Sequence, residues 1–299
     1  MVHVRIPATT ANMGPGFDCM GMALGLYNQV WAEITPNGLV IENSGNEAAN
    51  MPTDESHLVV KCMRTLFQHV GWKPDGLRVR VHSDIPVSRG LGSSAACIVG
   101  GLVAANTLAG KPLTTEQLLE MAVQLEGHPD NVAPALLGGI VVSACHGKKT
   151  SYVRFPVPEA IQCLTAIPDV SLSTAKAREA LPALVSFEDA VFNVGKASLL
   201  VAALMQEDYH VLQQAFEDRL HQPYRIRLLP PLLQVFNRAR EKNVKTITVS
   251  GAGPTLVYFV FPGSDARCQD FVDILHASSL KWEMIRLKGD NVGAVVETQ

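Results

Sequence analysis

The sequence has no pair of cysteines close enough to form a CxxC motif, and it has no long run of basic residues. Its six cysteines are scattered along the chain, which disfavours a zinc site or a disulfide scaffold and favours buried thiols in a reducing compartment. The net charge of −3 disfavours nucleic acid as a partner, because binding to phosphate backbones needs a basic surface. The N-terminus is typical of a strand and not of a signal peptide, so we expect a cytoplasmic protein.

The chain also lacks internal repeats and low-complexity segments. Its 299 residues, 47% hydrophobic and 18% charged, suffice for one large or two medium domains. Strands and helices are predicted in mixed order, without the regular alternation of a doubly wound sheet. We therefore expect an α+β fold with two domains that meet between residues 150 and 165. The predicted strands cover residues 4–8, 30–34, 39–42, 77–81, 138–145, 163–170, 246–249, 256–261, 282–287 and 294–297, and the predicted helices cover 55–71, 113–127 and most of 187–242.

One glycine-rich segment, PVSRGLGSSAACIVGG (Pro86–Gly101), lacks the lysine of the usual phosphate loop. A strand is predicted before it and a helix of small residues after it. The free backbone N–H groups of such a helix N-terminus can hold an anion without a lysine. Gly90 and Gly92 would let a phosphate approach the backbone, and one of the hydroxyls of Ser93 and Ser94 could reach a metal ion. The alternative is a tight turn, capped by serine, that precedes a core helix.

Residues 90–110 carry no charged side chain, so a membrane span has to be considered. Several of these positions are serine, asparagine, threonine or glycine, and large apolar side chains are sparse. This composition favours a helix that is buried on all sides in a protein core.

Two further glycine-rich segments carry polar side chains. In Pro7–Gly21 we predict a rigid loop that exposes Thr9, Thr10, Asn12 and Asp18 to a small polar ligand, or else an ordinary irregular connection. Between two predicted strands, Val249–Leu256 is either a second place of close approach to a ligand or a simple turn.

A pair of carboxylates lies in LEGHPDNVAP. Glu126 falls in the last turn of a predicted helix, where the helix dipole disfavours an acid by about 0.3–1 kcal/mol, and Asp130 follows four residues later. This pattern favours a cation between them, and Mg²⁺ binds one or two carboxylates together with substrate phosphates. The alternatives are a solvated helix end for Glu126 and, for His128, either a metal ligand or a hydrogen-bonded structural histidine. A phosphate cradle, acids for Mg²⁺ and polar loops together favour phosphoryl transfer from a nucleotide, although no Walker A pattern or protein-kinase signature is present.

The segment PVSRGLGSSAA resembles the central motif of the GHMP kinases, and five further segments are similar to the homoserine kinases among them. These are PATTANMGPGFDCMGMAL, EGHPDNVAPALLGG, STAKAREALP, QPYRIRLLP and SGAGPT, which follow one another through nearly the whole chain. The resemblance implies the GHMP two-domain fold. Residues 1–160 would form an N-terminal ATP-binding domain with a left-handed β-α-β unit, and residues 161–299 a C-terminal ferredoxin-like domain.

The resemblance also implies a site for ATP, Mg²⁺ and the small-molecule substrate L-homoserine. Ser94 and Glu126 would hold Mg²⁺. The phosphates would be bound by Pro86, Val87, Ser88, Arg89, Gly90, Leu91, Gly92, Ser93, Ser94, Ala95 and Ala96. The substrate would be bound by Asn12, Asp18, His128, Asp130, Asn131, Thr174, Arg178 and Arg225, and the catalytic residues would be Asn12, Asp18, Glu126, Asp130 and Asn131.

Elementary chemistry agrees with this implied substrate. Arg178 and Arg225 suit a carboxylate, since arginine binds carboxylates through two parallel hydrogen bonds. Asp18 and Asp130 can face an ammonium group, and Asn12 or Asn131 can bond the attacking hydroxyl. No general base is evident, so we expect direct attack of the substrate hydroxyl on the γ-phosphate.

One position departs from the family pattern, because His57 stands where these kinases often have asparagine near the adenine.

A homodimer is possible by analogy with similar proteins.

Overall fold

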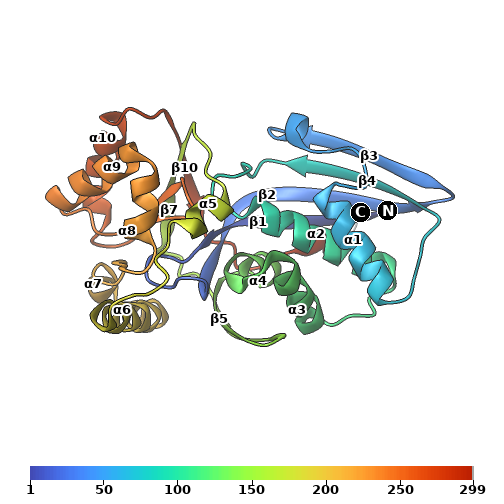
Figure 1. Ribbon diagram of the computed structural model, residues 1–299, viewed down its shortest axis with the longest axis horizontal. Coiled ribbons are helices and arrows are strands. Elements are labelled where there is room, and N and C mark those ends of the chain that lie inside the picture. Colours follow the sequence, from blue (N-terminus) through green and yellow to red (C-terminus); the bar gives the residue numbers. More distant parts are fainter. Residues whose placement is uncertain (298–299) are drawn as a thin grey trace.

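The computed structural model describes residues 1–297, whose strands form two sheets that lie along the long axis of the molecule (Figure 1). The first sheet has strand order β11-β1-β2-β4-β3, and β5 and β6 extend it from the start of β2. Its strands are β1 (Val2–Ala11), β2 (Met20–Thr35), β3 (Gly38–Gly45), β4 (Gly76–Ser83), β5 (Ile140–His146), β6 (Lys149–Phe155) and β11 (Val295–Glu297).

A β-α-β unit stands at one edge of this sheet. Strands β3 and β4 are parallel, and α1 (Leu58–His69) connects them. On β4, the side chains of Leu77, Val79 and Val81 are buried, whereas Arg78 and Arg80 are exposed, which confirms the predicted half-buried strand.

Helix α2 (Ser93–Leu108) is the buried helix predicted behind the glycine-rich segment. It packs on β1 and β2 on one side and on α1, α3 (Thr115–Glu126) and α4 (Pro129–Leu137) on the others. A side chain at Gly101 would collide with the backbone of Val59, so glycine allows the close approach of α1 to α2. Within residues 1–297, no helix combines the length and the apolar composition that crossing a membrane requires.

The second sheet has strand order β10-β7-β9-β8, and all neighbouring strands are antiparallel. Numbered along the chain, these strands lie in the order 4-1-3-2, which is the arrangement of a ferredoxin-like domain. The strands are β7 (Gln162–Pro168), β8 (Ile247–Val249), β9 (Leu256–Val260) and β10 (Trp282–Lys288). The helices of this half are α5 (Thr174–Glu179), α6 (Phe187–Gln206), α7 (Tyr209–Leu212), α8 (Gln222–Arg225), α9 (Pro230–Glu241) and α10 (Cys268–His276).

The α+β architecture is therefore confirmed. The last strand, β11, leaves the second half and pairs with β1 of the first sheet, and the two ends of the chain lie side by side in Figure 1. The domain division at residues 160 and 161 stays a prediction.

Three local expectations differ from the structure. Residues 7–11 and 20–21 belong to β1 and β2, so Thr9 and Thr10 are fully buried and are not exposed on a loop. Helix α4, which begins directly before Asp130, was not predicted. Of the six cysteines, only Cys62, Cys97 and Cys163 are buried among the described residues, and Cys145 is exposed.

Candidate active site

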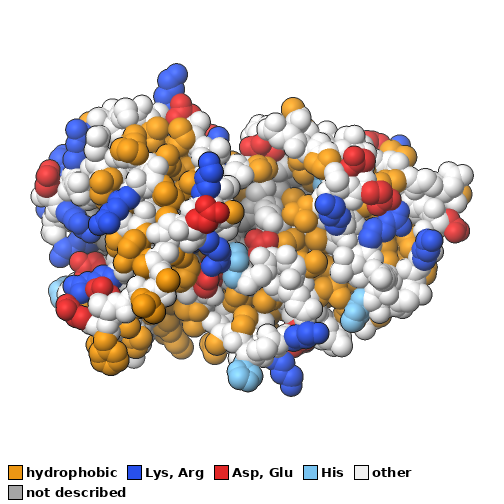
Figure 2. Space-filling model, in the orientation of Figure 1, with side chains coloured by type: hydrophobic (Ala, Val, Ile, Leu, Met, Phe, Trp, Pro, Cys, Tyr) orange, Lys and Arg blue, Asp and Glu red, His pale blue; other side chains and the backbone are white. Residues whose placement is uncertain are grey.

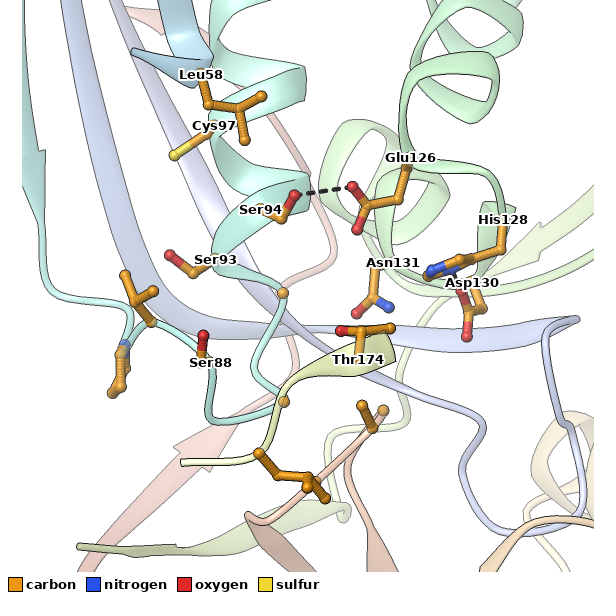
Figure 3. A pocket seen from close by; sticks show the side chains of 18 of the residues that line it. Leu58, Ser88, Ser93, Ser94, Cys97, Glu126, His128, Asp130, Asn131 and Thr174 are labelled. Carbon is orange, nitrogen blue, oxygen red and sulfur yellow. Dashed lines mark hydrogen bonds and ion pairs between the residues drawn. The ribbon is translucent and has the colours of Figure 1, made fainter. Parts of the chain in front are cut away.

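A cavity of about 290 Å³ lies where the two halves of the molecule meet, and Figure 2 shows the hollow between them. Most of the predicted site residues line it, and Figure 3 shows part of this lining. They are Asn12, Asp18, Pro86, Val87, Ser88, Gly90, Gly92, Ser93, Ser94, Glu126, His128, Asp130, Asn131, Thr174, Arg178 and Arg225. The other four predicted residues do not line the cavity, since Leu91, Ala95 and Ala96 are buried and Arg89 is half-buried outside the lining.

The N-terminus of α2 opens into this cavity. Gly92 precedes the helix with φ of 72°, and no side chain caps the first turn, so the N–H groups of Ser93 and Ser94 remain free for an anion. A side chain at position 92 would overlap the hydroxyl of Thr9 and crowd the amide of Asn131. Glycine is therefore required here for both the backbone conformation and the space.

The glycine-rich loop rests on the third glycine-rich segment, which belongs to the second half. Ser250 Oγ lies 2.6 Å from the carbonyl oxygen of Gly90, and the backbone N–H of Thr255 donates to the carbonyl oxygen of Arg89 over 3.1 Å. Gly251 and Gly253 also line the cavity. This segment thus supports the loop and borders the site.

Ser94 and Glu126 meet at the N-terminus of α2 (Figure 3). The Ser94 hydroxyl donates to Glu126 Oε2 over 2.9 Å. Gly127, with φ of 94°, ends α3 directly after Glu126, as predicted. The two side chains bring together oxygen atoms, the ligands that Mg²⁺ prefers, beside free N–H groups that suit phosphate. The chemistry of this pair therefore fits a magnesium ion bound with nucleotide phosphates.

Another part of the cavity carries a cluster of Asp18, His128 and Asp130, whose polar atoms lie within 4.8 Å of one another. Asp130 is in the first turn of α4 and is only 2% exposed, and it forms a hydrogen bond with His128 Nδ1. Burial by itself would lower the pKa of His128, but the hydrogen bond and the charge of Asp130 outweigh it and raise this pKa.

Two arginines stand beside this cluster. Arg178 donates from both terminal nitrogens to the carboxylate of Asp18, over 2.8 and 2.9 Å, and these hydrogen bonds raise its pKa despite partial burial. Arg225 is 3% exposed and donates from NH1 to the carbonyl oxygen of Gly251 over 2.7 Å. Burial lowers the pKa of Arg225 to about 10.

The two asparagines are fixed by their neighbours. Asn12, at φ of 70°, donates to the carbonyl oxygen of Gly251 and accepts from the backbone N–H of Asp18, each over 3.0 Å. Asn131 Oδ1 accepts from the Thr9 hydroxyl over 2.8 Å, which leaves its NH₂ group as the donor beside the cavity.

Comparisons with known proteins show the family of this chain. The family of GHMP kinase N-terminal domains matches residues 57–139. A homoserine kinase of Clostridium botulinum (strain Okra / Type B1) is 42% identical over 299 residues, which cover 100% of this chain and 99% of that protein. The homoserine kinase of Caldicellulosiruptor bescii is 43% identical over 298 residues, with 99% of this chain and 97% of that protein covered. The chain belongs to the homoserine kinase family. It is therefore a kinase of the GHMP class.

A crystal structure from this family has the same fold. The homoserine kinase of Cytophaga hutchinsonii superimposes with a TM-score of 0.87 at 27% identity, and the match covers 99% of this chain and 97% of that one. The GHMP kinase fold implied by the sequence motifs is thus confirmed.

In this member of the homoserine kinase family, the cavity is also lined by residues that the sequence analysis did not predict as site residues. Asn50, Met51, Pro52, His57 and Leu58 also line the cavity, and we call the part of the lining formed by Met51, Pro52, His57 and Leu58 the apolar slot. The only sequence signal for the slot was His57, which stands where these kinases often have asparagine.

His57 lies in the slot and is 1% exposed. Its Nδ1 accepts from the backbone N–H of Val59 over 3.2 Å, and its Nε2 is buried without a partner in residues 1–297. Burial lowers the pKa of His57. The neutral ring therefore carries its proton on Nε2, which is a donor in need of an acceptor.

Proposed function

We propose that this protein transfers the γ-phosphate of ATP to the side-chain hydroxyl of L-homoserine, and so forms O-phospho-L-homoserine for threonine biosynthesis. The observation that supports this best is the continuity of one cavity. It joins an uncapped helix N-terminus, suited to phosphates, with a cluster of carboxylates and arginines, suited to an amino acid.

The nucleotide would lie with its phosphates on residues 86–96 and its base in the apolar slot. The free N–H groups of α2 and the helix dipole would neutralise part of the phosphate charge. The slot contains Met51, Pro52 and Leu58, which suit the flat apolar faces of a purine, and the unpartnered Nε2–H of His57 can donate to a ring nitrogen.

Ser94 and Glu126 would hold Mg²⁺, because their oxygens converge at the same helix N-terminus. Bound there, the ion would neutralise charge on the phosphates and polarise the γ-phosphate for transfer. Glu126 keeps a carboxylate at an unfavourable helix end, and this role gives a physical reason for it.

The substrate would lie at the opposite end. Asp18 and Asp130 would face its ammonium group, and Arg178 and Arg225 would bind its carboxylate. The ion pair between Arg178 and Asp18 already holds one cationic and one anionic side chain in place. Thr174 lies on α5, the helix that carries Arg178. A substrate that carries both charges can bind to each partner of this pair at once.

The transfer would need no side-chain base. Asp130 is engaged by His128 and Asp18 by Arg178, and the Asn131 amide can only donate on its free side. We propose that the hydroxyl oxygen forms its bond to the γ-phosphorus while the bond to the β-phosphate oxygen breaks, and that the hydroxyl proton passes to an oxygen of the transferred phosphoryl group. Positioning and charge neutralisation would supply the catalysis.

We propose further that residues 1–160 and 161–299 are the two domains, that the protein works in the cytoplasm, and that it forms a homodimer. The division into two domains is supported by the distribution of the strands between two sheets. Only β11 departs from it, because this strand follows residue 161 but belongs to the first sheet. The other two rest on the sequence and on family analogy.

An assay of ADP release with a panel of acceptors tests the proposed function. Purified protein with ATP and Mg²⁺ should turn over with L-homoserine, and should be far less active with mevalonate, galactose or shikimate. A reaction without acceptor measures background hydrolysis of ATP. Turnover with another of these alcohols, and none with homoserine, would replace the proposed substrate and keep the kinase chemistry.

A further inference from the structure

A buried histidine connects two segments at the substrate end of the cavity. His221 directly precedes α8 and has no exposed surface. Its Nε2 lies 2.7 Å from the carbonyl oxygen of Gly14, and its Nδ1 lies 3.2 Å from NH1 of Arg225. Residues 12–18, which include Gly14, also carry Asn12 and Asp18. The ring therefore contacts both the segment with the carboxylate and the helix with the arginine.

The partners of His221 fix the position of its proton. A carbonyl oxygen can only accept, so Nε2 must carry the hydrogen. A guanidinium can only donate, so Nδ1 must be free of hydrogen. The ring is neutral, in agreement with the lowered pKa of His221, for which burial is the main cause and the charge of Arg225 a further one, against the opposing charges of Asp218 and Asp18.

The ring is itself held in place from other directions. Asp218 Oδ2 accepts from the backbone N–H groups of His221 and Gln222, over 3.0 and 2.7 Å, and so fixes the turn that starts α8. The ring of Phe17 stacks on the imidazole with 5.1 Å between the centroids. A histidine so constrained can define the position of a flexible side chain next to it.

We propose that His221 is a positioning residue for substrate binding, which holds the guanidinium of Arg225 in place through Nδ1 and the 12–18 segment through Nε2. The inference rests on the proposed role of Arg225 as a ligand of the substrate carboxylate. A free arginine side chain loses conformational entropy when it binds, and a guanidinium held by His221 and Gly251 has lost it beforehand. Affinity for the amino acid then depends on a residue that does not touch it.

Two substitutions separate the two contacts of the ring. His221→Asn places an amide oxygen near the position of Nδ1, so the acceptor for Arg225 is kept and the bond to Gly14 is lost. His221→Gln places an amide nitrogen near the position of Nε2, so the bond to Gly14 is kept and the acceptor for Arg225 is lost.

We expect His221→Gln to raise the KM for homoserine by about tenfold and His221→Asn to raise it by about threefold or less. In both variants kcat and the KM for ATP should stay within about twofold of the wild type. A merely structural role would change all three constants together with the melting temperature. An unchanged KM for homoserine in His221→Gln would overturn the inference.

Arg225→Lys distinguishes failure of the inference from failure of the proposed function. If Arg225→Lys raises the KM for homoserine and His221→Gln does not, only the positioning role is wrong. If Arg225→Lys leaves this KM unchanged, the proposed substrate contact is wrong, and the inference is wrong with it.

A measurement on the wild type covers the case in which the variants do not fold. In protein with ¹⁵N-labelled histidine, nuclear magnetic resonance should show the ring of His221 with hydrogen on Nε2 and none on Nδ1 near neutral pH. Addition of homoserine should shift the Nδ1 resonance through Arg225. A hydrogen on Nδ1 would overturn the inference without any substitution.

Discussion

At the scale of single residues, the contact between Ser94 and Glu126 lies where the proposed phosphate site and the proposed magnesium site meet. We expect Glu126→Gln, which keeps the shape of the side chain and removes its charge, to lower kcat by about 100-fold or more. The KM for homoserine should change by less than about threefold, because Glu126 is not among the proposed substrate contacts. Steady-state kinetics at saturating Mg²⁺ measures both constants.

Glu116→Gln is the matched control, since Glu116 lies on the same helix but is exposed in its first turn. It should leave kcat unchanged and destabilise α3 slightly through the lost interaction with the helix dipole. A Glu126→Gln variant with the kcat of the wild type would show that this carboxylate is not a metal ligand.

His57 is a residue-scale test of the nucleotide end. We expect His57→Phe to raise the dissociation constant of ATP by about tenfold, because it removes the buried donor and keeps the apolar bulk. His57→Asn should cost less, since its oxygen can still cap α1 and its NH₂ group remains a donor. Calorimetric titration with ATP measures the difference, and equal affinities for the two variants would contradict a hydrogen bond to the base.

At the scale of elements, the charge of His128 at the N-terminus of α4 makes the free energy of unfolding depend on pH. The pKa of His128 is raised by its bond to Asp130, so folding favours the protonated ring. The resulting stability is fully present below the ordinary histidine pKa of about 6.5 and is lost as pH rises through the higher pKa of the folded protein. The melting temperature should therefore exceed that of His128→Gln by more at pH 6 than at pH 9. A difference independent of pH would contradict the pairing.

Helices α2, α3 and α4 show how far sequence patterns reach. The capping box of Thr114 and Gln117 and the terminating Gly127 predict the bounds of α3 from local chemistry alone. Helix α4 escaped prediction because its two prolines are typical of loops. Pro129 occupies the first turn, where a proline is tolerated, and Pro134 leaves free the carbonyl oxygen of Asp130, which packs closely against Gly21 of β2.

The buried threonines of β1 show where local patterns end. Thr9 and Thr10 lie in a segment rich in glycine and proline and were expected on an exposed loop. Their partners are Asn131 and Ser250, which follow them by 122 and 240 residues. The spacing of residues within a short segment cannot predict contacts over such distances in the sequence, so the burial of these hydroxyls follows only from the assembled fold. The phosphate loop, the acids and the arginines, by contrast, are short motifs, and the sequence predicted them as residues of one site.

At the scale of the whole molecule, the site depends on contacts between the two halves. A serine hydroxyl has one hydrogen, so Ser250 donates to the carbonyl oxygen of Gly90 and accepts from the hydroxyl of Thr10. This bond holds the glycine-rich loop of the first half against the second. The geometry of the proposed nucleotide site would therefore depend on the interface between the halves and not on the loop alone.

We expect Ser250→Ala to lower the free energy of unfolding by about 1–3 kcal/mol, because it leaves the Gly90 carbonyl without its donor, and to raise the KM for ATP several-fold. Ser264→Ala is the matched control, since this buried hydroxyl bonds only to Phe259 and Phe261 within the described chain. Ser264→Ala should lower the free energy of unfolding by a similar amount to Ser250→Ala and leave the KM for ATP unchanged. Denaturant unfolding and steady-state kinetics on both variants separate the two effects. A Ser250→Ala variant that loses stability but keeps the wild-type KM for ATP would show that the contact contributes to stability alone and that the loop keeps its shape without it.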